Sequence, residues 1–289
     1  MTPLVSIAMP SFNQAQYIQA AIESVFSQAY PNIELIVSDG GSTDQTAEIL
    51  ARMGAEEPRL RWVSEADSGP ADAILKSFSK ARGEIIGWLN SDDLYADDAI
   101  PSMVNGFQNH PDWLMCYGRG EHVDETGQPI ALYPTQPPNV GVRGFEGGSF
   151  ICQPTVFLKV SALTLIGDLD RSLKTAFDYD YWIRAFRAFP DRIGFLEQII
   201  AKSRLHSDCI TQTMRATVAL EGLALSQRHL GKAQPHWAAT YLEELEAEIG
   251  ADTEALARET SIFLDQAAAY LTPSDLQQMR WATQQTSGS

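Results

Sequence analysis

The chain has 289 residues, of which 44% are hydrophobic and 20% charged, a composition typical of a packed globular protein with one large α/β domain, or such a domain plus an appendage. Its 37 acidic residues outnumber the 21 Lys and Arg, so the formal net charge is -16. That charge argues against a nucleic-acid partner and against broad docking on an anionic membrane, since both need clustered basic side chains. An acidic protein that binds a diphosphate needs local compensation, which a divalent cation supplies.

The cysteines and the N-terminus indicate where the protein resides. There are three cysteines and no CxxC pair, which argues against a disulfide framework or a zinc knuckle and favours a reducing compartment. Nothing after Met1 reads as a signal peptide, and no apolar run has the length of a transmembrane helix. We therefore expect a cytoplasmic protein without a transmembrane segment.

The first hundred residues alternate short apolar runs with amphipathic stretches. The apolar runs predict strands at 4–9, 33–38, 60–63 and 85–89. The stretches between them predict helices at 16–27, at 42–52 with Ser42 and Gln45 as a capping box, and from Pro70 onward. This order predicts an α/β fold with a mostly parallel sheet and helices on both faces.

The rest of the chain is less regular. We expect a hairpin within 115–132, a loop over the site at 133–148, a helix at 178–189 and a last strand at 193–200. Beyond residue 211 the pattern is helical, with breaks near 232–235, Gly250 and Pro273. The tail 285–289 is expected to be disordered.

Four polar clusters follow the four predicted strands, at 10–13, 38–41, 64–67 and 90–93. In a parallel sheet these strand ends meet at one edge, where ligands bind. A single polar strand end has little meaning, but four in succession predict one shared site.

Asp92 and Asp93 follow the fourth strand, and two carboxylates there are suitable oxygen ligands for Mg²⁺ or Mn²⁺, which would bridge a diphosphate. The plainer reading is a turn that caps the next helix. Asp39 follows a strand and precedes two glycines. Its carboxylate can accept hydrogen bonds from a base or ribose, and the glycines let the backbone approach a ligand. The alternative is an ordinary turn.

Five further side chains are candidates with plain structural alternatives. Asp67 and Asp72 bracket a helix start, where they could serve as caps. Asp178 and Asp180 begin an aromatic helix; residues two apart point in different directions, so at most one faces a shared pocket as a general base. His206 could complete a metal shell, although a lone His is more often structural.

The chain resembles a bacterial family 2 glycosyltransferase with the GT-A type of fold. The segments that carry the resemblance are 5–13 (VSIAMPSFN), 36–44 (IVSDGGSTD), 64–69 (SEADSG), 83–93 (GEIIGWLNSDD) and 177–184 (FDYDYWIR). They occur in the family's order, and 152–154 and 167–170 also resemble its segments. The resemblance covers roughly 4–210, so the expected domains are a glycosyltransferase domain at 1–210 and a C-terminal helical region at 211–289.

The resemblance implies a Rossmann-like fold, a nucleotide-sugar donor, a divalent metal (Mn²⁺ or Mg²⁺) and inversion at the transferred sugar. The side chains that it assigns to nucleotide-sugar binding are Pro10, Ser11, Asn13, Asp39, Asp67, Asp72, Asn90, Ser91 and Asp92. It implies that Asp93 is the direct metal ligand and that His206 closes the metal site. It also implies Asp178 as the catalytic base, with Asp180 as the alternative.

Two positions depart from the family pattern. Leu75 replaces an Asn, and Phe177 replaces the Glu that usually precedes the catalytic Asp. The second change leaves the choice between Asp178 and Asp180 open, with Asp178 favoured.

We expect transfer, most simply from a UDP-sugar, to an acceptor hydroxyl in cell-surface polysaccharide or glycolipid synthesis. A saccharide or lipid-linked acceptor would place the enzyme at the inner face of the membrane, and the C-terminal helices could form a homodimer. The alternatives are a catalytically silent nucleotide-binding scaffold and a Mg²⁺-dependent phosphohydrolase. The phosphohydrolase usually has Asp-x-Asp after an early strand, where this chain has 10–13 (PSFN).

Overall fold

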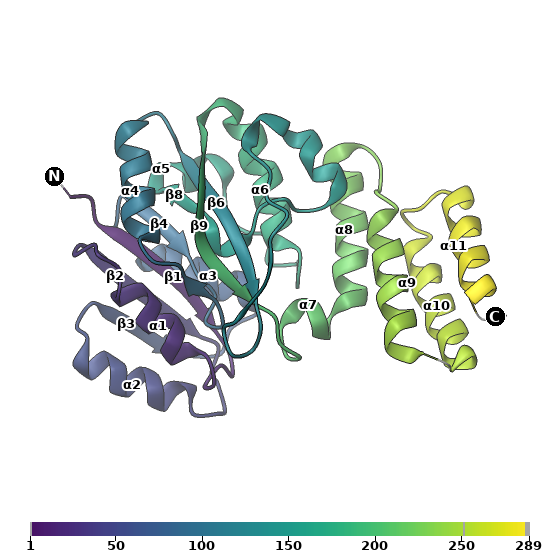
Figure 1. Ribbon diagram of the computed structural model, residues 1–289, viewed down its shortest axis with the longest axis horizontal. Coiled ribbons are helices and arrows are strands. Elements are labelled where there is room, and N and C mark those ends of the chain that lie inside the picture. Colours follow the sequence, from purple (N-terminus) through teal and green to yellow (C-terminus); the bar gives the residue numbers. More distant parts are fainter. Residues whose placement is uncertain (1, 251, 287–289) are drawn as a thin grey trace. The chain divides into compact units, whose positions relative to one another are not determined.

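The computed structural model describes residues 2–250 and 252–286, and the chain divides into two compact units (Figure 1). The first unit contains the residues up to 141 together with 149–206, and the second contains 142–148 and the residues from 207 onward. A domain boundary at residue 210 stays a prediction.

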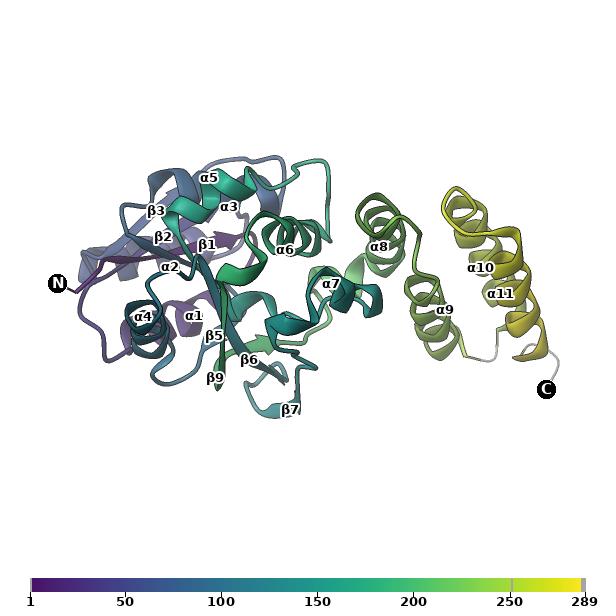
Figure 2. The same cartoon turned by 90° about the horizontal axis from the view of Figure 1, so that it is seen from above.

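The first half of the first unit is a parallel sheet in the order β3-β2-β1-β4. The strands are β1 (Val5–Ser11), β2 (Ile33–Asp39), β3 (Leu60–Ser64) and β4 (Ile85–Trp88). The connecting helices are α1 (Ile18–Phe26), α2 (Thr46–Glu56) and α3 (Pro70–Lys80). Helix α1 lies on one face of the sheet and α3 on the other (Figure 2), so the predicted α/β architecture is confirmed.

Beyond β4 the sheet becomes mixed and continues in the order β8-β6-β9-β5, with β7 paired to β6. The elements are β5 (Leu94–Tyr95), α4 (Ala99–Asn109), β6 (Met115–Val123), β7 (Pro129–Leu132), β8 (Phe157–Lys159), α5 (Val160–Ile166), α6 (Phe177–Ala188) and β9 (Ile193–Arg204). Short 3-10 turns lie at Pro138–Val140, Gln153–Thr155 and Pro190–Arg192. The hairpin and the late helix were predicted; β5, α4, β8 and α5 were not.

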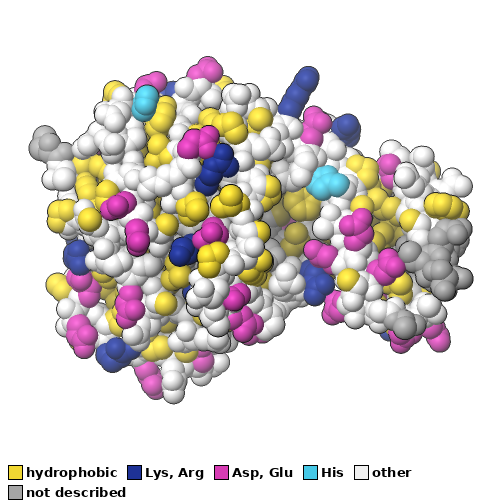
Figure 3. Space-filling model, viewed as in Figure 1, with side chains coloured by type: hydrophobic (Ala, Val, Ile, Leu, Met, Phe, Trp, Pro, Cys, Tyr) yellow, Lys and Arg dark blue, Asp and Glu magenta, His cyan; other side chains and the backbone are white. Residues whose placement is uncertain are grey.

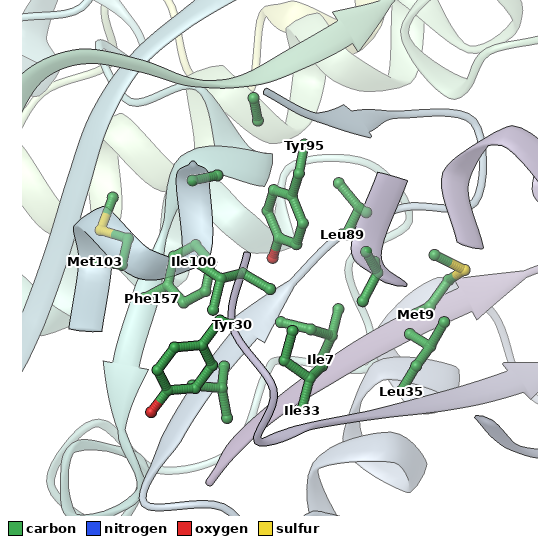
Figure 4. Packing of buried hydrophobic residues seen from close by; sticks show 14 of the residues in the cluster. Ile7, Met9, Tyr30, Ile33, Leu35, Leu89, Tyr95, Ile100, Met103 and Phe157 are labelled. Atoms are coloured by element: carbon green, nitrogen blue, oxygen red, sulfur yellow. The ribbon is translucent and has the colours of Figure 1, made fainter. Parts of the chain in front are cut away.

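The core of this unit lies against the side of the sheet that α1 and α4 cover. Ile7 and Met9 of β1 pack near Leu35 of β2, and Tyr95 and Phe157 extend the cluster (Figure 4). All five are nearly or fully buried, and each such side chain contributes about 1.5–3 kcal/mol relative to exposure. This burial holds the strand ends, and therefore the polar clusters, at fixed positions.

The second unit is helical and has its own core. It consists of a 3-10 segment (Val142–Gly147), α7 (Ile210–Thr213), α8 (Arg215–Leu230), α9 (His236–Ile249), α10 (Thr253–Ala267) and α11 (Pro273–Thr286). Leu223, Phe263 and Leu264 form the centre of its core. The helix ends match the predicted breaks. Helix α11 includes residues 285 and 286, so disorder there was wrong, and 287–289 lie outside the described residues.

Two surface observations bear on partners. On the face shown in Figure 3 the visible Lys and Arg side chains lie scattered among acidic ones and do not gather into a basic patch. Among the residues that the structure describes, no helix combines the length and the apolar character needed to cross a membrane.

Candidate active site

The loops after β1 and β2 are bonded to each other. The Asn13 amide N–H donates to Ser42 Oγ at 2.7 Å, and the Thr43 N–H donates to Asn13 Oδ1 at 2.9 Å. Asn13 has a φ of 53°, a left-handed conformation that Asn tolerates better than most residues. The side-chain amide oxygen of Asn13 therefore holds the loop after β2. This bond fixes the two loops at the edge of the expected nucleoside site.

Asp39 is buried at the end of β2, with 1% exposure. Its carboxylate accepts hydrogen bonds from the Ser42 N–H at 3.0 Å, from the Ser64 hydroxyl at 2.6 Å and from the Ser42 hydroxyl. Ser42 thus serves Asp39 and does not cap α2, which begins at Thr46. A carboxylate has about four acceptor positions, and these bonds fill three of them.

Asp67 lies directly over Gly40. Its Oδ1 accepts from the Gly69 N–H at 2.8 Å, and a Cβ at residue 40 would meet Asp67 Oδ2 at 2.8 Å. A larger residue at position 40 would force that carboxylate to shift. The close approach brings the third strand end next to the second.

Asp72, in the first turn of α3, is surrounded by cationic groups. Arg171 Nε donates to Asp72 Oδ1 at 3.1 Å, and Lys76 Nζ lies 3.6 Å from Asp72 Oδ2. Burial alone would raise the pKa of Asp72, but the hydrogen bond from the Ser68 N–H and the two cations outweigh it and lower the pKa. Asp72 is therefore an ionised anchor for two basic side chains.

Asn90 is a hydrogen-bonding hub just after β4. Its Oδ1 accepts from Trp88 Nε1 at 3.1 Å, and its Nδ2 donates to Asp93 Oδ2 at 3.3 Å and to Gln153 Oε1 at 2.9 Å. Gln153 Nε2 donates in turn to the Trp88 carbonyl at 2.9 Å. Together these bonds fix the turn that carries the two aspartates.

Asp93 points into the protein and is 4% exposed. Its Oδ1 accepts from the backbone N–H of Arg204 at 2.9 Å. Burial, followed by the charge of Asp92, raises the pKa of Asp93 well above its usual range. Both of its oxygens therefore accept hydrogen bonds, Oδ2 from Asn90 of the turn and Oδ1 from the end of β9.

Asp92 is the carboxylate that meets His206. His206 Nε2 lies 3.1 Å from Asp92 Oδ2, and the imidazole is 1% exposed and packs 4.7 Å from the ring of Tyr17. His206 Nδ1 has no hydrogen-bond partner among the described residues. An oxygen and a nitrogen that converge in this way are a suitable pair of ligands for Mn²⁺.

The described residues contain no group of three or more His, Cys, Asp or Glu side chains arranged to hold a metal ion. Asp92 and His206 would therefore supply two ligands, and the phosphates of a donor and water would supply the rest, as is usual for metals that bridge a nucleotide diphosphate.

Asp178 and Asp180 have different environments at the start of α6. Asp180 is 2% exposed and accepts from Arg184 Nε at 2.8 Å. Arg184 also donates to the carbonyls of Ile166 and Asp168, at 2.6 and 2.8 Å. Asp178 is only partly buried, and its Oδ1 accepts from the Tyr179 N–H at 2.7 Å. Asp180 thus belongs to a buried structural ion pair.

Aromatic packing joins α6 to the aspartate turn. Trp88 stacks on Phe177 with ring centroids 5.8 Å apart, and Trp182 lies 5.9 Å from Trp88. Burial raises the pKa of Cys152 well above its usual range, and the charges of Asp93 and Asp178 raise it further. Phe177 and Trp182 of α6, which flank Asp178 in the sequence, pack against Trp88 just before the aspartate turn.

The remaining nucleotide-site candidates lie mostly inside the protein. Pro10 is within β1, opposite Ser38. Ser11 and Ser91 are buried, at 5% and 3% exposure, and Ser11 Oγ has no hydrogen-bond partner among the described residues. A ligand bound at this edge of the sheet would therefore make few direct contacts with the side chains of Ser11 and Ser91.

Three further residues belong to the site and were not among the predicted ones. Phe12 is 58% exposed at the end of β1, and Gln153 and Arg204 bond to the aspartate turn. An exposed aromatic side chain directly after a buried strand was the available signal for Phe12. The other two make contacts over long sequence separations, which no local pattern reveals.

The family described as glycosyl transferase family 2 matches residues 6–163, which is more than half of the chain. The chain therefore belongs to glycosyl transferase family 2, a family of enzymes.

Its relatives by sequence are longer proteins. The chain is 31% identical over 220 residues to an uncharacterized glycosyltransferase of Rickettsia felis, covering 71% of this chain and 35% of the relative. It is 29% identical over 188 residues to a chondroitin synthase of Escherichia coli, covering 65% and 27%. The chain thus spans about a third or less of the length of these two relatives, and 67% of an uncharacterized glycosyltransferase of Rickettsia prowazekii.

Two solved structures share the fold. Residues 1–349 of S. aureus TarS, in complex with UDP-GlcNAc, superpose with a TM-score of 0.63 at 18% identity, covering 92% of this chain and 73% of TarS. The mannosyltransferase PcManGT from Pyrobaculum calidifontis, in complex with GDP-Man and Mn²⁺, gives 0.60 at 19% identity, covering 98% and 80%. The GT-A type of fold is therefore shown for this chain.

Proposed function

We propose that this chain transfers a sugar from a nucleoside-diphosphate sugar, most simply a UDP-sugar, to an acceptor hydroxyl with inversion. The observation that carries the proposal is the 3.1 Å approach of Asp92 and His206 at the strand edge that also holds Asp39. Structural neighbours bound to UDP-GlcNAc and to GDP-Man with Mn²⁺ support this class of donor.

The donor's base would lie between Asp39 and Phe12. The acceptor position left on the Asp39 carboxylate suits the imide N–H of uracil, and the exposed Phe12 ring offers a stacking surface. The hydrogen bonds that join the loops after β1 and β2 through Asn13 would keep the base-binding part of the site ordered before the donor binds.

A divalent cation, with Mn²⁺ favoured by the imidazole ligand, would bind Asp92 and His206 and neutralise charge on the diphosphate leaving group. We had expected Asp93 as the direct ligand. Asp93 accepts hydrogen bonds from Arg204 and Asn90. We therefore propose that Asp93 positions the turn and that Asp92 is the metal ligand.

Asp178 would act as the general base. It is partly exposed, and the preceding Phe177 stacks on Trp88 near the aspartate turn. In that position it could accept the proton of an acceptor hydroxyl as that oxygen attacks the anomeric carbon opposite the diphosphate. Asp180 is occupied by Arg184 and would hold α6 in place. One displacement with one base gives inversion.

The acceptor is proposed to be a growing polysaccharide or a lipid-linked saccharide. The support is sequence similarity to chondroitin synthase of Escherichia coli and to hyaluronan synthase of Pasteurella multocida, at 29% and 28% identity. The chain covers 27% and 21% of the length of these two relatives.

The test is a panel of UDP- and GDP-sugars with Mn²⁺ and saccharide acceptors, read as nucleoside diphosphate release together with the anomeric configuration of the product. Acceptor-dependent release and an inverted product are expected. A retained configuration would reject the single-displacement mechanism, and no turnover with any donor would reject the function.

A further inference from the structure

We infer that Arg204 is a positioning residue that sets the metal affinity of the Asp92–His206 pair by fastening the aspartate turn to the hairpin turn between β6 and β7. This inference rests on the proposed function, because the metal pair belongs to the proposed donor site.

The first set of contacts is with the aspartate turn. The Arg204 backbone N–H donates to Asp93 Oδ1 at 2.9 Å, and the side-chain Nε donates to the Asp92 carbonyl at 2.8 Å. One residue therefore holds the main chain of the proposed ligand and the side chain of its neighbour. The direction in which the Asp92 carboxylate points depends on both.

The second set of contacts is with the hairpin turn at 124–127. Arg204 Nη1 donates to the carbonyls of Asp124 and Glu125, at 3.2 and 2.7 Å. The turn is also bonded internally, because Asp124 Oδ1 accepts from the Thr126 and Gln128 amides at 2.8 and 2.9 Å. A rigid turn is thus attached to the aspartate turn through a single guanidinium.

Arg204 is 6% exposed, and its guanidinium carbon lies 4.9 Å from the ring centroid of Tyr17. Tyr17 in turn packs against His206. The guanidinium therefore also contacts the aromatic ring that packs against the second proposed ligand. The guanidinium donates to three carbonyls, those of Asp92, Asp124 and Glu125, in a fork geometry that a lysine ammonium cannot reproduce.

The end of β6 and the residue after β9 are also bonded, from the Leu205 N–H to the Val123 carbonyl at 2.9 Å. Arg204 therefore lies where β6, β9 and the aspartate turn converge, two residues before His206. Substitution of a side chain that hydrogen-bonds to metal ligands and orients them typically lowers metal affinity or activity by about ten- to one-hundred-fold.

The experiment measures the transfer rate against Mn²⁺ concentration at saturating donor, for wild type and Arg204→Lys. The half-saturating Mn²⁺ concentration should rise by about ten-fold or more, while the rate at saturating Mn²⁺ falls much less. The matched control is Arg119→Lys, on neighbouring β6, because Arg119 pairs with the exposed Glu197. The control should keep the wild-type Mn²⁺ requirement.

A lowered melting temperature with an unchanged Mn²⁺ requirement would show that Arg204 is merely structural and would overturn the inference. Gly127→Ala provides a second variant in case Arg204→Lys does not fold. Gly127 has a φ of 87°, and a Cβ there would lie 3.7 Å from Arg204 Nη1, so alanine strains the hairpin turn and leaves Arg204 intact. A raised Mn²⁺ requirement supports the coupling, and an unchanged one contradicts it.

The proposed function and the inference fail in different ways. Absence of turnover in the wild type would reject the function. Mn²⁺ binding in the presence of UDP, followed by electron paramagnetic resonance, would then still compare wild type with Arg204→Lys. Equal affinities in that measurement would reject the role of Arg204.

Discussion

His206 Nε2 and Asp92 Oδ2 lie 3.1 Å apart although the two residues are separated by 114 positions in the chain. Asp92 follows β4 and His206 follows β9, so the pair exists only once the mixed half of the sheet has formed. The site therefore depends on the complete first unit and not on the parallel half alone.

His206→Asn should abolish the additional stabilisation that Mn²⁺ gives to the UDP-bound wild type. A ligand at about one hundred times its Kd stabilises the folded state by about 2.7 kcal/mol, which is visible as a higher melting temperature. His110→Asn is the matched control, since His110 is exposed beyond α4 and stacks on Trp113. An equal shift in the His206 variant would remove His206 from the metal site.

Asp178→Asn should lower turnover, whereas Asp180→Asn should lower the free energy of unfolding. Loss of a general base lowers turnover by about one-hundred- to ten-thousand-fold, so Asp178→Asn should keep donor affinity and stability but lose turnover. Asp180→Asn should lower the free energy of unfolding by about 2 kcal/mol, because Arg184 loses its buried partner. Urea unfolding and steady-state rates separate the two. Nearly full turnover in the Asp178 variant would refute the base assignment.

Gly40→Ala should destabilise the protein by about 1 kcal/mol, because the added methyl group overlaps the Asp67 carboxylate at 2.8 Å. The loss should shrink to less than about 0.5 kcal/mol when Asp67 is alanine, since the two sites are coupled. A double-mutant cycle by urea unfolding measures this. Additive effects would mean that Asp67 does not lie over Gly40.

Glu34→Gln should change the acid limb of the stability curve. Burial would raise the pKa of Glu34, but hydrogen bonds from the Ser6 hydroxyl and the Arg82 N–H, together with the Arg61 guanidinium, outweigh it and lower the pKa. A depressed folded-state pKa gives stability that is present above the unfolded value of about 4.3 and is lost as pH falls through the folded value. The variant should therefore be less stable at neutral pH and lose less stability on acidification.

Thermal unfolding from pH 7 to pH 3 checks this. Parallel curves for wild type and Glu34→Gln, displaced by a constant amount, would show that the Glu34 carboxylate is not perturbed.

The parallel half of the fold was predictable because its strands are continuous apolar runs. Strands buried on both faces, such as β1 and β2, carry that pattern. Strand β8 has three residues and β5 has two, which is too short for a periodic pattern, so these two strands were missed while the β6–β7 hairpin and β9 were predicted.

The site shows the same division. The strand-end clusters around Asp39, Asp67 and Asp92 could be identified because topology alone brings them to one edge. The sequence could not tell which of Asp92 and Asp93 faces outward, because that depends on Arg204, more than a hundred residues away. Ser42 looked like a helix cap from its spacing, yet its hydroxyl is used by Asp39.

Calorimetric titration of UDP and GDP, each with and without Mn²⁺, into wild type and Asp92→Asn tests the central claim most directly. The account predicts that UDP binds the wild type, that Mn²⁺ strengthens this binding, and that the strengthening is lost in the variant while the protein stays folded. Binding of neither nucleotide to folded wild-type protein, or Mn²⁺-dependent binding that survives in Asp92→Asn, would contradict it.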